Sequence, residues 1–98
     1  MTQSVIHHPR VAWDGALAFV RAAGSMDYDR FAGQVYLRLG VEIYGELSDT
    51  RQRLILAEAE TPGDRYIVDV EAGKWRVRLQ DLMIERPDLV GAIQELSH

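Results

Sequence analysis

The chain has 98 residues, of which 47% are hydrophobic and 27% charged, and its formal net charge is −4 at pH 7. Such a composition is typical of one soluble globular domain, and the acidic excess disfavours nonspecific nucleic-acid binding, which Lys and Arg normally provide. Because the chain has no cysteine, no long apolar run and no secretory signal at its start, we expect a cytoplasmic protein without disulfides, thiolate metal sites or membrane-spanning helices.

Two helices are predicted in the first part of the chain, after a flexible N-terminal arm over residues 1–9. Apolar residues recur at helical spacing over residues 10–23 and predict the first helix. Ser25 is a candidate N-cap for a second helix, which we expect to end before Gly40. The two helices are expected to form a tight helical hairpin within a single domain that spans residues 10–98.

Beyond Gly40 the apolar period changes from 3.6 to 2, which is typical of β-strands. Clusters of turn-forming residues separate the alternating segments. We therefore predict four antiparallel strands in a meander, over residues 41–47, 53–60, 66–70 and 75–79.

A C-terminal helix is predicted to begin near Pro87, because proline is well tolerated in the first turn of a helix. The predicted fold class is therefore α+β, with an N-terminal helical hairpin, a four-stranded antiparallel β-meander and a C-terminal helix. An alternative makes residues 65–82 helical. Five β-branched or aromatic residues between Tyr66 and Trp75 favour the strands instead.

Pairing the strands in register places apolar side chains on both faces of the predicted sheet. One face is the predicted core: Val41, Ile43, Ile55, Ala57, Ala59, Tyr66, Val68, Val70, Trp75, Val77 and Leu79. The opposite face carries an apolar patch with two arginines beside it: Tyr44, Leu54, Leu56, Ile67, Arg76 and Arg78. An apolar patch rimmed by charge is typical of an interface, or of a surface that another helix covers.

No catalytic or metal-binding motif is found in the sequence. The three histidines are residues 7, 8 and 98, near the two ends of the chain, where a side chain is difficult to bury or orient. Asp27 and Asp29 are explained by the favourable interaction of acidic residues with a helix N-terminus. We therefore predict no catalytic residue, no metal, no cofactor and no enzymatic activity.

We predict a non-enzymatic protein–protein interaction module, such as a small bacterial or phage-encoded regulator, inhibitor or immunity-type protein. Its partner is another protein, bound through the apolar patch with Tyr44, Arg76 and Arg78 as anchors, because Tyr and Arg dominate binding hot spots. A homodimer through the same face is expected if the C-terminal helix does not cover the patch.

Two other functions remain open. One is a small-ligand-binding protein or a histidine-independent enzyme, with a pocket between helices and sheet near Trp13, Tyr28, Tyr66 and Trp75. The other is an RNA-binding sheet surface around the two arginines of the patch, which the neighbouring acidic residues disfavour. We identify no resemblance to a known protein family in the sequence.

Overall fold

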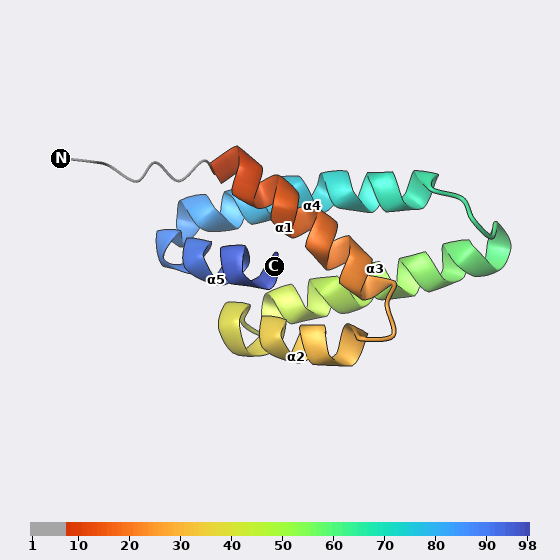
Figure 1. Ribbon diagram of the computed structural model, residues 1–98, viewed down its shortest axis with the longest axis horizontal. Helices are drawn as coiled ribbons and strands as arrows, with labels where there is room; N and C mark the ends of the chain where they lie inside the picture. The colour runs from red at the N-terminus through yellow and green to blue at the C-terminus, as the bar shows by residue number, and fades with distance from the viewer. Residues whose placement is uncertain (1–7) are drawn as a thin grey trace.

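A computed structural model describes residues 8–98, which form five α-helices and contain no β-strand (Figure 1). The α-helices are α1 (His8–Ala23), α2 (Tyr28–Leu39), α3 (Val41–Glu60), α4 (Tyr66–Glu85) and α5 (Val90–Leu96). A short 3-10 helix, η1 (Pro87–Leu89), joins α4 to α5. Within this described range, none of the helices combines the length and the hydropathy needed to span a bilayer.

The predicted α+β fold class, with its antiparallel β-meander, is therefore wrong. The first two predicted strands belong to α3 and the last two belong to α4, and each of these helices has 20 residues. Of the three turns that connect the predicted strands, those at residues 48–50 and 71–74 also lie inside these helices. The third, at Pro62 and Gly63, does connect α3 to α4, and Gly63 has a φ of +79° there. The alternative helical interpretation of residues 65–82 corresponds to α4.

The alternating pattern is misleading because two residues four positions apart lie on the same face both in a strand, with its period of 2, and in a helix, with its period of 3.6. Ile43 and Leu47 share one face in a strand and also in a helix, and so do Trp75 and Leu79. All four are buried in the structure. Other members of the predicted core face are exposed, because burial follows the helical period: Val41, Ile55, Tyr66 and Val77.

The two N-terminal helices are present, but they do not form the predicted tight hairpin. α1 packs mainly on α4 and α2 mainly on α3, so α1 and α2 contact each other little. Gly15 lets α1 approach closely, since a Cβ atom there would lie 2.9 Å from Cδ1 of Leu79. In the core between these helices, the ring of Phe19 lies 4.9 Å from Trp75 and 5.3 Å from Phe31.

The ends of the first two helices differ in detail from the prediction. Of the predicted flexible arm, residues 1–7 lie outside the described residues, whereas His8 and Pro9 begin α1. Asp27, rather than Ser25, occupies the N-cap position of α2, although the Ser25 hydroxyl accepts a hydrogen bond from the Asp27 backbone N–H. Gly40 ends α2 as expected, and its φ of +100° permits the sharp change of direction into α3.

The hairpin of α3 and α4 projects beyond the other helices (Figure 1). We define its outer part, residues 51–70, as the hairpin arm, and none of these residues is buried. Thr50 and Glu71, which flank the arm at its base, are both buried. Since a helix rises about 1.5 Å per residue, α3 extends roughly 15 Å beyond Thr50. The arm nevertheless contains nine hydrophobic residues: Leu54, Ile55, Leu56, Ala57, Ala59, Tyr66, Ile67, Val68 and Val70.

Candidate functional site

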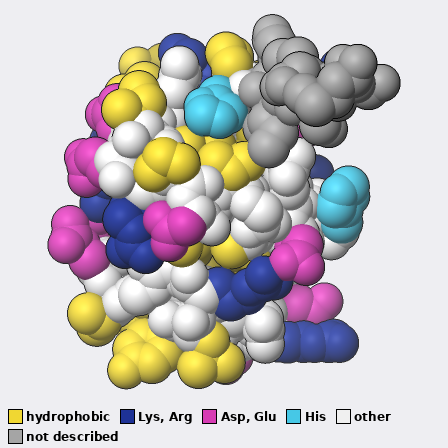
Figure 2. Space-filling view, turned by 90° about the vertical axis from the view of Figure 1, so that its left-hand side faces the viewer, with side chains coloured by type: hydrophobic (Ala, Val, Ile, Leu, Met, Phe, Trp, Pro, Cys, Tyr) yellow, Lys and Arg dark blue, Asp and Glu magenta, His cyan; other side chains and the backbone are white. Residues whose placement is uncertain are grey.

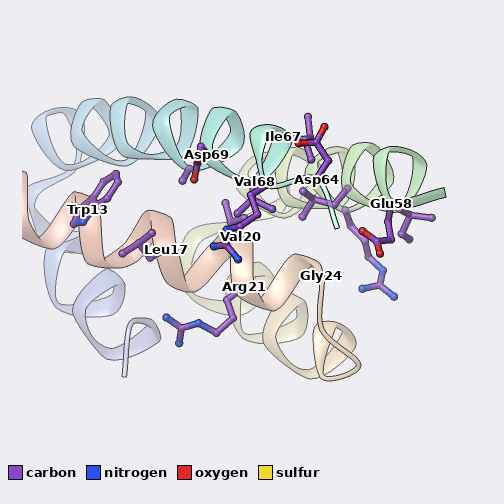
Figure 3. A pocket seen from close by; sticks show the side chains of 15 residues that line it. Trp13, Leu17, Val20, Arg21, Gly24, Glu58, Asp64, Ile67, Val68 and Asp69 are labelled. Atoms are coloured by element: carbon purple, nitrogen blue, oxygen red, sulfur yellow. The ribbon is translucent and has the colours of Figure 1, made fainter. Parts of the chain in front are cut away.

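A groove with a volume of about 920 Å³ lies between α1 and the hairpin arm. Figure 3 shows Trp13 and Leu17 on α1 at one side, Val68 and Asp69 on α4 opposite them, and Glu58 on α3 toward the far end. The apolar part of the lining comes from all three helices: Trp13, Leu17, Val20, Leu54, Ile55, Ile67, Val68 and Ala72. A surface of this kind presents apolar side chains to whatever occupies the groove.

The charges in the groove are balanced. Among residues 8–98, six charged side chains line it, three of each sign: Arg21, Arg51, Arg65, Glu58, Asp64 and Asp69. The described lining of the groove therefore has no net charge.

The groove face of α3 carries a specific order of charge and hydrophobicity. Its four residues have the helical spacing i, i+3, i+4 and i+7: Arg51, Leu54, Ile55 and Glu58. The basic residue lies at the base of the arm, the acidic residue lies toward the tip, and two aliphatic residues lie between them. Ile55 is 50% exposed, so this face is open to a partner.

Arg51 anchors the base of the arm to the connection between α1 and α2. Its Nη1 atom donates hydrogen bonds to the carbonyl oxygens of Ala23 at 2.9 Å and Ser25 at 3.1 Å. Its guanidinium carbon also lies 4.5 Å from the ring centroid of Tyr28, which is a cation–π distance. These contacts fix the wall of the groove at the point where α3 leaves the core.

A buried carboxylate, Glu71, joins α4 to α3 at the same base. Arg53 donates to both of its oxygens, at 3.0 and 2.8 Å, and Lys74 donates at 3.3 Å. Thr50 donates to Glu71 at 3.2 Å and accepts a 2.8 Å hydrogen bond from the indole N–H of Trp75. Within residues 8–98, no buried side-chain nitrogen or oxygen lacks a hydrogen-bond partner. The network is therefore complete and has a structural role.

The charge of Glu71 is maintained by its partners. Burial alone raises the pKa of this carboxyl, but the hydrogen bond and charge of Arg53, together with those of Lys74, outweigh burial and hold the pKa below its ordinary value. Glu71 is therefore ionised at neutral pH. The ion pair that it forms with Arg53 links the two helices of the hairpin.

The groove contains two of the six residues that were predicted to bind a partner. Leu54 and Ile67 line it, on α3 and α4 respectively. Leu56 also lies on the arm and is 61% exposed, but it is not part of the lining. Tyr44 lies near the start of α3, far from the arm, where its ring packs edge to face against Tyr36 with 5.6 Å between the centroids.

Tyr44 belongs to a second exposed apolar surface, at the corner between α2 and α3. Its members, which we call the corner patch, are Tyr36, Leu37, Val41 and Tyr44. Figure 2 views the end of the molecule opposite the tip of the arm, and apolar side chains gather at its lower edge, where this corner lies. The structure therefore separates the predicted apolar patch into two surfaces at opposite ends of α3.

The two predicted arginine anchors lie on α4, and Arg78 is already engaged within the protein. Arg78 donates to both carboxylate oxygens of Glu46, at 2.8 and 2.9 Å, and to Glu42 at 3.2 Å. The hydrogen bond that Arg78 donates to Glu46 is the main reason why the pKa of Arg78 is raised. Arg76 is exposed and does not line the groove. The alternative of an RNA-binding sheet also requires a sheet, and residues 8–98 contain none.

The residues proposed for a ligand pocket do not converge. Trp13 lines the groove, but Tyr28 and Trp75 are buried in the core and Tyr66 is 73% exposed. Asp29 lies in the first turn of α2, as its helix-terminal explanation requires. In the part of the chain that the structure describes, no group of three or more His, Asp or Glu side chains is placed to hold a metal ion.

No protein-family model, no curated protein and no solved structure matches this chain. We therefore infer its function from the groove itself. Sequence analysis missed three of the groove residues on α3: Arg51, Ile55 and Glu58. The sequence signal that could have identified them is the helical spacing that they share with Leu54. This spacing was overlooked because the segment was interpreted as a strand with Ile55 in the core.

Proposed function

We propose that this chain is a protein–protein interaction module that binds an amphipathic helix in the groove between α1 and the hairpin arm. The observation that carries this proposal is that four apolar residues of the arm line the groove and none of them is buried: Leu54, Ile55, Ile67 and Val68. Burial of apolar surface is favourable by roughly 25 cal/mol per Å². Contiguous apolar surface that stays exposed is a mark of interaction sites.

The composition of the groove supports a helix as its occupant. Helices bind in grooves through aliphatic and aromatic anchors at positions i, i+3, i+4 and i+7, and the groove supplies an apolar lining from three helices. Its balanced rim charges favour a partner that carries both acidic and basic side chains. Such a chain would act as a regulator, inhibitor or immunity-type protein, by shape and charge complementarity rather than by catalysis.

Site-specific photocrosslinking tests this proposal. A photoreactive phenylalanine analogue is placed at Ile55 inside the groove, or at Ile84, which is 67% exposed on α4 and is not part of the groove lining. In the cells that naturally produce the protein, we expect a discrete protein adduct from position 55 and none from position 84. The absence of any protein adduct from position 55, or equal adducts from both positions, would overturn the proposal.

A further inference from the structure

We infer that the helix bound in the groove is α3 of a second copy of this chain, so that the protein is a homodimer with antiparallel hairpin arms. This inference rests on the proposed function, because it identifies the occupant of the same groove. The interface would be isologous, with the same surface contributed by both copies around a two-fold axis.

The order of residues on the groove face of α3 makes this face complementary to itself. When two such helices pack antiparallel, Arg51 of one copy lies opposite Glu58 of the second copy, and Leu54 lies opposite Ile55. The two-fold axis repeats both pairings, so two ion pairs flank a continuous aliphatic centre. A parallel arrangement would instead place Arg51 against Arg51 and Glu58 against Glu58, which like-charge repulsion disfavours. The order of residues on the groove face of α3 therefore favours antiparallel packing of two copies of this helix.

The two charged residues on the groove face of α3, Arg51 and Glu58, can still form hydrogen bonds and an ion pair with a partner. Arg51 uses Nη1 for both of its backbone acceptors, and no other hydrogen bond of its guanidinium is found among the described residues. Glu58 accepts one hydrogen bond on Oε2, from the Gly63 backbone N–H at 3.2 Å. Neither side chain has an ion-pair partner within residues 8–98.

The remaining charges also permit two copies to approach. Each chain has a net charge of −4, which by itself opposes self-association. The described groove lining, however, has equal numbers of basic and acidic side chains, so this repulsion is not concentrated at the contact. Arg65, the N-cap residue of α4, and Asp69 in the first turn of α4 give the groove a second pair of opposite charges four residues apart. Two arms together provide four helices, which is the usual number for enclosing an apolar centre between helices.

Light scattering at increasing concentration is the first test, with the corner patch as the matched control. We expect the unmodified chain and Leu37→Glu to approach about 22 kDa, twice the 11.1 kDa of one chain, whereas Ile55→Glu stays at 11.1 kDa. Leu37 is 75% exposed and Ile55 is 50% exposed, so neither substitution places a charge in the core. A monomeric unmodified chain at high micromolar concentration overturns the inference. So does a dimer that Leu37→Glu abolishes and Ile55→Glu leaves intact.

Charge reversal tests the antiparallel register. Glu58→Arg and Arg51→Glu each place like charges opposite one another, and we expect each variant alone to self-associate at least about tenfold more weakly, a change of roughly 1.4 kcal/mol. When the two variants are mixed, the new carboxylate at position 51 faces the new guanidinium at position 58, and the unmodified pair is also matched. The mixture should therefore form a heterodimer. Mixed variants that associate no better than either variant alone overturn the register.

Cysteine crosslinking keeps the register testable if Arg51→Glu does not fold. The chain has no cysteine of its own, so a single introduced thiol reports one position. Ile55→Cys places two thiols beside the two-fold axis, and we expect a covalent dimer on mild oxidation, whereas Ile84→Cys should stay uncrosslinked. An Ile55→Cys chain that scatters as a dimer but does not crosslink overturns the antiparallel register.

The two proposals fail in different ways. If the chain is monomeric and position 55 crosslinks to a different protein, the second copy is not the occupant and the proposed function stands. If position 55 crosslinks to no protein at all, not even to a second copy, the proposed function itself is overturned.

Discussion

Glu71 has an unusual position for an acidic residue, since its side chain is 1% exposed while remaining ionised. Replacing it with Gln removes the charge that Arg53 and Lys74 neutralise. We expect Glu71→Gln to lower the free energy of unfolding at neutral pH by about 1.5–3 kcal/mol, the usual range for a hydrogen bond to a charged group. Urea unfolding monitored by circular dichroism measures this difference, with the exposed Glu60→Gln as the control.

The loss of stability caused by Glu71→Gln should depend on pH. The pKa of Glu71 is lowered in the folded state, so its contribution to stability is complete above the unfolded-state value, near 4.5, and is lost as the pH falls through the folded-state pKa. The gap in unfolding free energy between the unmodified chain and Glu71→Gln should therefore narrow between pH 7 and about pH 3. A gap that stays constant or widens in acid would contradict the ionised, paired state of Glu71.

The two cations around Glu71 should not be equivalent. Arg53→Met leaves a buried carboxylate without its bidentate donor, and we expect a loss of about 3 kcal/mol, since an uncompensated buried charge is strongly destabilising. The Lys74 side chain is 60% exposed, so Lys74→Met should cost less than about 1 kcal/mol, as for surface ion pairs. Thermal unfolding of the two variants compares them directly. Equal losses would show that both ion pairs are screened to the same extent.

Glycines inside the helices offer a second comparison at the scale of single residues. At Gly45 and Gly73, a new Cβ atom would meet no other atom within 4 Å, so we expect Ala at either position to stabilise the chain by about 0.5–1 kcal/mol. Gly15→Ala should instead destabilise it by about 1–3 kcal/mol, because the Cβ atom would lie 2.9 Å from the fully buried Leu79. Melting temperatures that rise for Gly15→Ala would contradict the close packing of α1.

At the scale of elements, local preference and tertiary packing disagree along α4. Ile67 and Val68 favour strands over helices, but such preferences amount to less than about 1 kcal/mol per residue. Fully burying Trp75 or Leu79 contributes about 1.5–3 kcal/mol each. α4 buries these residues on one helical face, and the large contact with α1 decides the outcome. The sequence pattern predicted both N-terminal helices because no competing alternation was present there.

The candidate site was predictable only in part, for a similar reason. Leu54 and Ile67 were placed on one face of a predicted sheet, and in the structure both line the groove although they lie on helices. Ile55 was assigned to the core because a strand would alternate it with Leu54, whereas a helix brings both to the groove face. The pairing of Arg78 with Glu46 spans 32 positions, so only the tertiary arrangement reveals that Arg78 is engaged.

The hairpin arm should exchange its backbone amides more readily than the rest of the chain when it has no partner. None of residues 51–70 is buried, so local opening of the arm exposes little additional apolar surface. In Ile55→Glu we expect rapid hydrogen exchange along residues 51–70 and slower exchange in α1, and we expect the dimeric unmodified chain to protect the arm. Equal protection of the arm in both proteins would indicate that it is covered in some other way.

At the scale of the whole molecule, the core depends on contacts between distant parts of the chain. α1 has its largest interface with α4, and α5 packs on α1 and α2. The core is one cluster that includes residues from all five α-helices. Because no consecutive pair of helices forms an independent core, we expect the molecule to unfold in a single cooperative transition, apart from the arm.

This arrangement has a consequence for the nascent chain. The ribosome completes α1 at Ala23 but completes α4 only at Glu85, which is 62 residues later. At a synthesis rate of about 5–20 residues per second, roughly 3 to 12 s pass between the completion of α1 and the completion of α4, the helix on which its apolar face packs. Phe19, whose ring packs against Trp75 in the folded core, therefore lacks this partner during most of the synthesis of the chain.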